Sequence, residues 1–533
     1  MDLLVGYGSI GLCFAATIAT LYVVGIKDKD FTDYSVGGRS FGSWYQTMSF
    51  LNTWWPGTVF ISFAGLAAGQ GVLGFYALSY SLLTVVLMYL IARRVWLWGS
   101  DFDLRTQSDL FGMRFNSRAT RTTAAVIGII SQFPWIVLGM QALGLVIFYV
   151  SFGHLSFQTA VVVGVVLLIV RQYWTIQMGM RGVVVTDFVQ GLIAYLLGPL
   201  VLIGLIVWLV RHGHGMDQIP PDKWSLPGLG STSGPLFLFS LVFTGAIGGW
   251  SWPAIFVRLF TADGVRSLKN SAALGLPISF VFYPLLMVFA MMATTVPGVA
   301  ARPDDVLFIT TSQIGAGAVA LAAVVVFAAT MGNVDGNLQS NGAQVANDLV
   351  ADYMTLSDQG KKVIAKVSIG VLTLAAGGVA ALNLSGLIIL AIMAYQGIVQ
   401  LAVPQFLGIF WRRGNKVGAI AGMVAGIVTA AVLQLLYPTS IPWLGGLTSG
   451  MAGMAVNLAI YIACAYLIQM SGAEAARVNH LFVSTAEPGR AVVAGQASHP
   501  RLLGSGITIS TSRRVMRRRA LRSCRRSAGT PNV

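Results

Sequence analysis

Two short stretches decide how this chain folds: Asn52-Thr53-Trp54-Trp55-Pro56-Gly57 and Gly248-Gly249-Trp250-Ser251-Trp252-Pro253. Each places a Trp-Pro step beside glycine in the middle of an apolar run, at 45–69 and at 236–260. Proline lacks the backbone N–H and clashes with the preceding turn, so each stretch should break a helix and free backbone carbonyls. Inside a membrane such irregular backbone is tolerated only where protein buries it or where it lines a cavity. The paired breaks therefore predict an internal binding site.

The composition around these breaks is that of a membrane protein. The chain has 533 residues, of which 56% are apolar and only 10% charged, whereas soluble domains carry roughly a quarter of charged residues. This excludes a soluble enzyme, a disordered chain and a coiled coil. Apolar runs of about 20 residues, enough to cross a bilayer, predict an all-α protein with about thirteen transmembrane helices. The runs cover 2–26, 45–69, 72–92, 122–150, 157–176, 183–210, 236–260, 270–293, 316–348, 363–384, 386–411, 417–437 and 442–469.

The basic residues predict the orientation of these helices. The first run has Asp2 before it and Lys27 and Lys29 after it, which is unlike a cleaved secretory signal. With the N-terminus outside, all but three of the 34 Lys and Arg lie on or toward the cytoplasmic side; the exceptions are Arg211, Lys223 and Arg302. Such a bias is the positive-inside rule. The net charge of +15 therefore reflects topology, and we expect no nucleic-acid partner.

The order of the runs predicts five segments. They are an extra N-terminal transmembrane helix (1–30), a first five-helix repeat (31–210), a second five-helix repeat (236–411), two C-terminal transmembrane helices (415–469) and a basic cytoplasmic tail (470–533). Because five is odd, the second repeat must enter from the opposite side, which gives an inverted repeat whose broken first helices correspond. Such paired interruptions mark the central site of many transporters. The alternative is that both breaks are ordinary kinks. We expect the tail to be disordered, with a membrane-binding basic patch as the alternative.

Enzyme chemistry has no support in the sequence. The three cysteines, Cys13, Cys464 and Cys524, offer neither a metal-ligand spacing nor a disulfide framework. The five histidines fall in predicted loops or in the tail. We expect no enzyme and no cofactor, apart from sodium as a possible coupling ion.

Several short motifs, in order over almost the whole chain, resemble the sodium/solute symporter family, which includes proline, pantothenate, monocarboxylate and sugar symporters. They are Asp33–Ser40, Thr186–Gln190, Trp252–Arg258, Ala328–Met331, Pro404–Arg413 and Gly418–Gly422, and the resemblance covers roughly 30–437. It implies inverted five-helix repeats of the leucine-transporter type, thirteen or more spans and an N-terminus outside the cell membrane.

The resemblance also implies a cation site. The family's sodium ligands fall on Asn52 and Trp55 at the first break and on Ala329, Gly332 and Asn333 in the run 316–348. Members that use sodium usually carry Ser or Thr at the last two of these positions, so the site is degenerate here and coupling to protons is the other possibility.

Two intramembrane carboxylates could compensate, since such groups are costly at the helix centre and therefore functional by default. Asp187 matches a family aspartate, and Asp335 lies two residues beyond Asn333. The structural alternatives are that Asp187 pairs with Arg181 and that Asp335 is a polar residue of an internal vestibule.

The residues at the breaks predict a solute pocket. We expect its lining to include Trp54, Gly57, Gln132, Trp135, Trp250 and Trp252. Tryptophan faces suit a flat or apolar body, and helix N-termini attract anions, so the candidate solutes are a small carboxylate and a neutral planar compound such as a nucleobase. The alternative is that these tryptophans belong to an interfacial belt.

The predicted function is secondary active transport. A small organic solute would cross the cell membrane by alternating access, coupled to sodium or protons, with the solute, the cation and the lipid bilayer as partners. The rival functions are a solute-sensing membrane receptor and an uncoupled uniporter or exchanger of the same fold.

Overall fold

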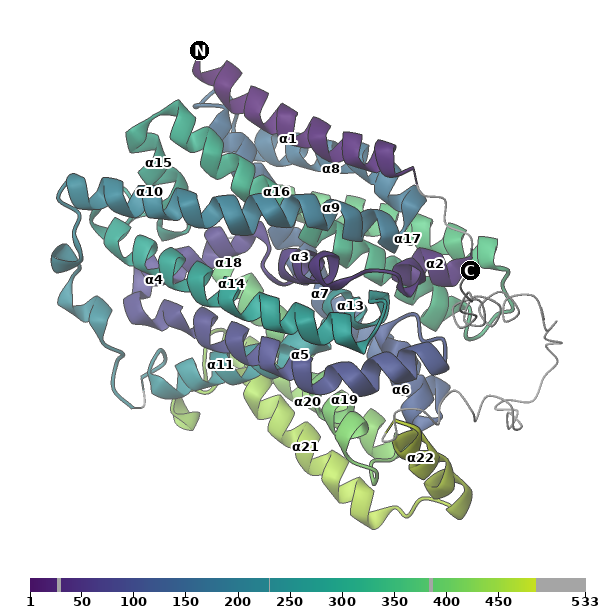
Figure 1. Ribbon diagram of the computed structural model, residues 1–533. Coiled ribbons are helices and arrows are strands. Elements are labelled where there is room, and N and C mark those ends of the chain that lie inside the picture. Colours follow the sequence, from purple (N-terminus) through teal and green to yellow (C-terminus); the bar gives the residue numbers. More distant parts are fainter. Residues whose placement is uncertain (26–29, 230, 383–386, 486–533) are drawn as a thin grey trace, which may run out of the picture. The chain divides into compact units, whose positions relative to one another are not determined.

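The computed structural model describes residues 1–25, 30–229, 231–382 and 387–485, and these ranges are helical, without β-strands (Figure 1). The long helices are α1 (Asp2–Val24), α5 (Tyr76–Asp101), α7 (Arg118–Val150), α8 (Phe157–Met178), α14 (Val265–Met292), α16 (Ala316–Gln344), α17 (Asp358–Ala381), α20 (Lys416–Leu436) and α21 (Ser449–Leu467). The shorter helices outside the broken spans are α2 (Phe31–Val36), α6 (Gln107–Phe115), α15 (Val306–Ile314) and α22 (Gly472–Ser484).

Four further groups of helices follow one another across a short break or a turn of another helix type. They are α3 (Ser43–Trp54) with α4 (Ser62–Gln70), α9 (Met180–Leu192) with α10 (Gly198–Arg211), α11 (Pro235–Gly248) with α12 (Pro253–Phe256) and α13 (Arg258–Thr261), and α18 (Leu387–Ile398) with α19 (Ala402–Phe410). Among the described residues, ten helical stretches are long and apolar enough to cross a membrane. The number is eleven if the two helical pieces on either side of the second break, which are bent by 58°, together count as one further span. The chain is therefore a multi-pass membrane protein, while the number thirteen stays a prediction.

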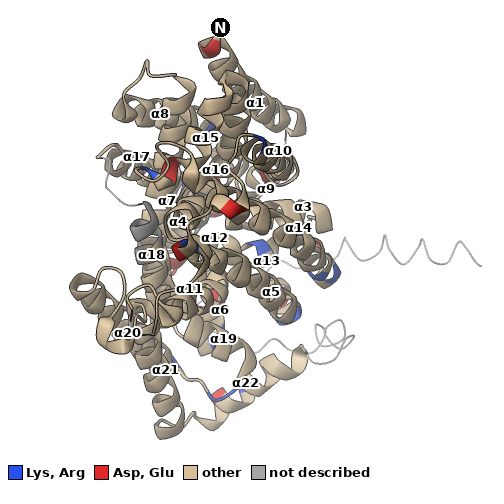
Figure 2. Cartoon of the chain, turned by 90° about the vertical axis from the view of Figure 1, so that its left-hand side faces the viewer, with Lys and Arg blue, Asp and Glu red and all other residues tan. Residues whose placement is uncertain are grey.

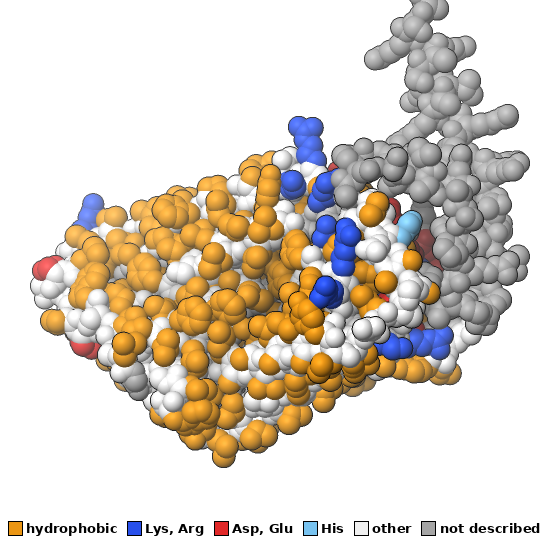
Figure 3. Space-filling model, turned by 90° about the horizontal axis from the view of Figure 1, so that it is seen from below, with side chains coloured by type: hydrophobic (Ala, Val, Ile, Leu, Met, Phe, Trp, Pro, Cys, Tyr) orange, Lys and Arg blue, Asp and Glu red, His pale blue; other side chains and the backbone are white. Residues whose placement is uncertain are grey.

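The surface agrees with a membrane environment. The face seen from below in Figure 3 is covered largely by apolar side chains, and Lys and Arg gather toward one end of it. In the cartoon of Figure 2, the segments coloured as charged residues are sparse along the helices. This distribution leaves apolar side chains, such as Val428 on α20 and Leu458 on α21, exposed where lipid would lie.

The first break has a simple cause. The last bond of α3 runs from the Trp55 amide to the Leu51 carbonyl, at 2.7 Å. The next bond would need an N–H on Pro56, which proline lacks, so the Asn52 carbonyl loses its helical partner. The carbonyl of Thr53 instead accepts from the Asn333 amide on α16, at 2.6 Å. The unwound segment is thus fixed to the middle of α16.

The second break is built in the same way. Pro253 cannot bond to the Gly249 carbonyl, and the chain turns from a 3₁₀ turn (Gly249–Ser251) through the extended Trp252 into α12. The Trp250 carbonyl accepts from the Gln405 amide of α19 at 2.7 Å, and the Ser251 carbonyl accepts from Gln107 of α6 at 2.8 Å. At both breaks, side-chain amides from other helices therefore bond to backbone carbonyls of the unwound segment.

The tail differs from the prediction over residues 472–484. Instead of being disordered from residue 470, the chain forms α22, which packs on the helix bundle. Arg477 donates to the carbonyls of Met113 and Arg114 at 2.9 and 2.8 Å, and the Trp98 indole donates to the Leu481 carbonyl at 3.0 Å. These bonds explain how a short polar segment stays helical. Residues 486–533, with the predicted basic patch, lie outside the described residues.

An acidic residue, Asp304, packs against α4, the second helix of the first broken span. Asp304 lies in a 3₁₀ turn (Pro303–Asp305) before α15 and packs against α4, where a Cβ on Gly65 would fall 2.8 Å from the Asp304 Cα. Burial, and then the neighbouring Asp305 carboxylate, raise the pKa of Asp304 to about 6. The folded protein therefore disfavours the ionised form of Asp304.

This shift predicts a pH-dependent stability. A carboxyl whose pKa is raised by folding stabilises the protein below its unfolded pKa, and this contribution is lost as the pH rises through about 6. Asp304→Asn should therefore raise the melting temperature near pH 8, by the equivalent of about 1–3 kcal/mol, with the gain vanishing toward pH 4. Melting curves in detergent at several pH values measure this, with the exposed Asp217→Asn as control. Equal gains at both pH values would contradict the prediction.

Candidate solute and cation site

The centre of α16 is where the two broken spans meet the rest of the molecule. Gly332 and Gly336 lie four residues apart, on one face of the helix. A Cβ on Gly332 would fall 2.5 Å from Asp187 Oδ1 and 2.8 Å from Gln190 Oε1, and one on Gly336 would fall 2.8 Å from Arg258 Nη2. The two glycines therefore leave space for charged and polar side chains next to the middle of α16.

Asp187 is fully buried, and both of its carboxylate oxygens accept hydrogen bonds. Its Oδ2 accepts from Ser49 at 2.7 Å and from Arg258 at 3.1 Å, and its Oδ1 accepts from the Asn52 amide at 3.1 Å. Arg258 also donates to Thr53 Oγ1 at 2.9 Å, so the ion pair joins α9 to both broken spans. The alternative partner considered for Asp187 is wrong, because Arg181 pairs with Asp33 at 2.6 Å.

A second buried ion pair lies nearby. Asp335 of α16 pairs with Arg171 of α8, and both side chains are 1% exposed. Arg171 also donates to Thr186 Oγ1, at 3.3 Å, next to Asp187 in the chain. Two aspartates and two arginines thus lie together with formal charges that cancel, and Asp335 also lines a small cavity beside α8.

The residues predicted to bind sodium come together here, and two of their oxygens already accept hydrogen bonds. The Trp55 carbonyl accepts from the Tyr195 hydroxyl, and Asn333 Oδ1 accepts from Asn337 at 3.0 Å. Gly332 has no side-chain oxygen, and the adjoining space holds the Asn52 amide, whose N–H groups repel a cation. Ala329 is buried one turn earlier on α16.

Of these side-chain oxygens, Asn52 Oδ1 is buried without a partner. A hard cation needs several oxygen ligands at once. Sodium binding by these residues therefore stays a prediction, which requires ligands in addition to Asn52 Oδ1.

Three of the predicted solute-binding residues lie together. Trp252 stacks on Trp135 with ring centroids 5.9 Å apart, and Tyr395 packs edge-on against Trp252 at 5.3 Å and Trp135 at 6.0 Å. Gln132, one turn before Trp135, donates to Asn337 at 2.7 Å and leaves its own Oε1 without a partner. An aromatic face beside a buried amide oxygen suits a flat compound that can donate a hydrogen bond.

The other three residues, Trp54, Gly57 and Trp250, make different contacts. The Trp250 indole donates to the Thr84 carbonyl at 2.8 Å, and its ring stacks on Phe50 at 5.4 Å. A Cβ on Gly57 would fall 2.5 Å from the Val326 carbonyl, so Gly57 allows the backbone to approach α16. Trp54 packs edge-on against Tyr80 at 5.4 Å, and its indole N–H is buried without a partner. Trp54 alone of these three keeps a free donor.

Sequence reasoning did not assign roles to Arg171, Arg258, Tyr195 and Tyr395. A signal for the arginines was available, since Arg171, Asp187, Arg258 and Asp335 all fall within predicted spans, and buried charges occur in pairs. No comparable signal marks the two tyrosines, because nothing in the sequence distinguishes them from other aromatic residues of the spans.

Comparison with known proteins decides the family. The model of the sodium:solute symporter family matches residues 34–426, which is most of the chain. This protein belongs to the sodium:solute symporter family. Members of this family are transporters, so the expectation that the chain is not an enzyme is confirmed.

Individual relatives are distant. The chain is 25% identical to the uncharacterised symporter YhjB of Bacillus subtilis over 50% of this chain and 53% of that protein. It is also 25% identical to the osmoregulated proline transporter OpuE of Bacillus subtilis, over 80% of this chain and 87% of that protein. A solved Na⁺-coupled sialic acid symporter in a substrate-bound, outward-open state has the same fold, with a TM-score of 0.71, 17% identity and coverage of 87% of this chain and 98% of that one. The fold is of the leucine-transporter type.

The packing at Gly332 predicts the effect of restoring the hydroxyl that sodium-using family members carry. Gly332→Ser should lower the stability of the folded protein by about 1–3 kcal/mol, because its Cβ would press on Asn52 and Asp187. Gly317→Ser on the same helix is the control, since a Cβ there meets nothing within 4 Å. Melting temperatures in detergent compare the two. A Gly332→Ser variant as stable as the control would show that Asn52 does not fill this space.

Proposed function

We propose that this family member is a secondary active symporter that moves a small organic solute by alternating access, driven by a cation gradient. The observation that carries the proposal is that both broken spans meet α16 beside a buried cluster of paired charges. Thirteen spans, the inverted repeats 31–210 and 236–411, an outside N-terminus and a cytoplasmic C-terminus in the cell membrane are parts of the same proposal, supported by the charge bias of the sequence.

The solute class follows from the aromatic cluster. Trp135, Trp252 and Tyr395 present flat faces, and the buried Oε1 of Gln132 offers an acceptor beside them. These four side chains carry no charge, and the nearest described arginine of the break, Arg258, is held by Asp187. A neutral planar compound, such as a nucleobase, therefore fits better than a small carboxylate.

The family and the site favour different coupling ions. The family favours sodium, whereas the engaged oxygens around Gly332 favour the proton. Asp187 is central to both mechanisms, because either cation must compete with the Arg258 guanidinium for the same carboxylate.

Uptake into proteoliposomes tests the proposal. The purified chain should accumulate a solute from a set of nucleobases and small carboxylates when a sodium or a proton gradient is imposed. A receptor would accumulate no solute, and a uniporter or exchanger would equilibrate it without concentrating it. Either result would replace the proposed function.

The variant Asp187→Asn distinguishes the two cations. If sodium drives uptake, the variant should need more sodium for half-maximal uptake, because the balancing charge is lost. If protons drive it, gradient-driven accumulation should disappear while solute exchange continues. Folded protein is measured in parallel by size-exclusion chromatography, because the change leaves Arg258 buried without its carboxylate. Well-folded Asp187→Asn protein that transports like the wild type would remove Asp187 from coupling.

The pocket is tested by three tryptophan variants. Trp252→Ala and Trp54→Ala should each weaken solute binding about tenfold or more, since a stacking surface or a free indole donor is lost, with little loss of folded protein. Trp250→Ala should instead reduce the yield of folded protein, because it removes the bond to Thr84 and the stack on Phe50. Binding is measured by isothermal titration with the solute found in the uptake screen. Unchanged affinity in both of the first two variants would return these residues to a packing role.

A further inference from the structure

We propose that the Arg171 guanidinium is a tethered cation: it supplies from within the chain the charge that Asp335 would otherwise take from a free monovalent cation. The pair forms a latent cation position between α8 and α16 that is separate from the Asp187–Arg258 pair. The proposal rests on the proposed function only for its significance in transport, and its test does not need transport activity.

The first argument is electrostatic. Asp335 and Arg171 are each 1% exposed on their side chains. An ionised carboxylate in such a place is strongly unfavourable without a positive partner. Arg258 is already held by Asp187, at 3.1 Å. Asp335 therefore depends on Arg171, and removing that side chain would leave a carboxylate that must recruit a cation from solution or become protonated.

The second argument is the incomplete bonding of Arg171. Its Nη2 contacts Asp335 and donates to Thr186, whereas its Nε and Nη1 are buried without a partner. Arg258, by contrast, uses both terminal nitrogens, with Nη1 on the Met180 sulfur and Nη2 on Thr53 and Asp187. Arg171 therefore does not form the two parallel hydrogen bonds that arginine often makes to a carboxylate. It provides mainly a positive charge.

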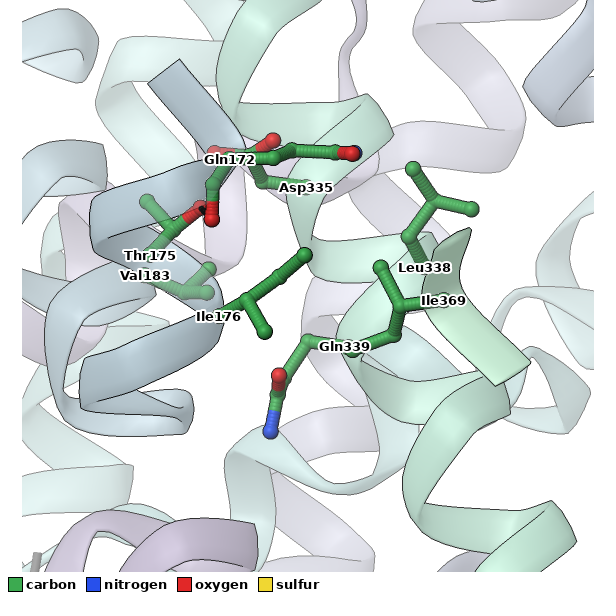
Figure 4. Close-up of a pocket in the computed structure, with 8 residues that line it drawn as sticks. All are labelled: Gln172, Thr175, Ile176, Val183, Asp335, Leu338, Gln339 and Ile369. Atoms are coloured by element: carbon green, nitrogen blue, oxygen red, sulfur yellow. Dashed lines mark hydrogen bonds between the residues drawn. The ribbon is translucent and has the colours of Figure 1, made fainter. Parts of the chain in front are cut away.

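The third argument is space. A small cavity of about 10 Å³, room for about one water molecule, adjoins Asp335. It is lined by Gln172, Thr175, Ile176, Val183, Asp335, Leu338, Gln339 and Ile369. Figure 4 shows Gln172, Thr175 and Asp335 on one side of this cavity and the apolar Leu338 and Ile369 on the other. Carboxylate, hydroxyl and amide oxygens are ligands suited to hard cations. Truncating Arg171 would join its space to this cavity, beside oxygens that could bind a monovalent cation.

The test uses purified full-length protein in detergent and three variants. Arg171→Ala should lower the melting temperature by several degrees, and millimolar guanidinium or sodium chloride should restore it in a saturable way. Choline chloride at the same ionic strength, whose cation is too bulky for the cavity, should not. Arg171→Ala with Asp335→Asn removes both charges and should melt near the wild type, without a response to either salt. Arg171→Lys keeps the tethered charge and should also show no response.

Two results would overturn the proposal. One is an Arg171→Ala protein whose response to guanidinium and sodium matches that of the double variant. The other is a double variant as unstable as Arg171→Ala. If Arg171→Ala cannot be purified, the yield of folded protein in membranes replaces the melting temperature. The double variant and Arg171→Lys should then both give higher yields than Arg171→Ala. Equal yields would contradict the proposal. A wild-type chain that fails to transport under any gradient would refute the proposed function and leave this result intact.

Discussion

Backbone groups freed by Pro56 and Pro253 must find hydrogen-bond partners inside the membrane, and the rest of the structure depends on this requirement. A carbonyl without a partner in the hydrocarbon region costs several kcal/mol. The chain meets this cost with side-chain amides carried on other helices: Asn333 bonds to Thr53, and Gln405 bonds to Trp250. These bonds bring α16 to the first break and α19 to the second, so the irregular segments also set the arrangement of the helices around them.

The parts of this arrangement that depend on local chemistry could be predicted from the sequence. Both breaks lie where proline and glycine indicate, and the long helices follow the apolar runs because length and hydropathy are local properties. Residues 472–484 show where such reasoning fails. Their polar composition suggests disorder, yet Arg477 and Leu481 find partners on α5 and α6 that only the folded chain brings close.

The candidate site was less predictable, because pairing at membrane depth is a tertiary property. Asp187 is six residues from Arg181 and 71 from Arg258, and sequence distance favours the wrong arginine. The contacts of the tryptophans were equally unpredictable from the sequence. Trp250 and Trp252 are two residues apart at one break, but one indole is fixed by the Thr84 carbonyl and the other ring faces Trp135. No local pattern separates the two roles.

The neutrality of the charge cluster constrains the proposed transport cycle. With Asp187 on Arg258 and Asp335 on Arg171, a cation that entered would add an uncompensated charge to a buried region, which is strongly unfavourable. Coupling through Asp187 therefore requires the cation to displace Arg258 from the carboxylate. Arg258 begins α13, directly beyond the second break, and Trp252 lies at that break. A displaced Arg258 would move the segment that also carries Trp252, so in the proposed cycle cation binding and the solute pocket would be linked through the five residues between them.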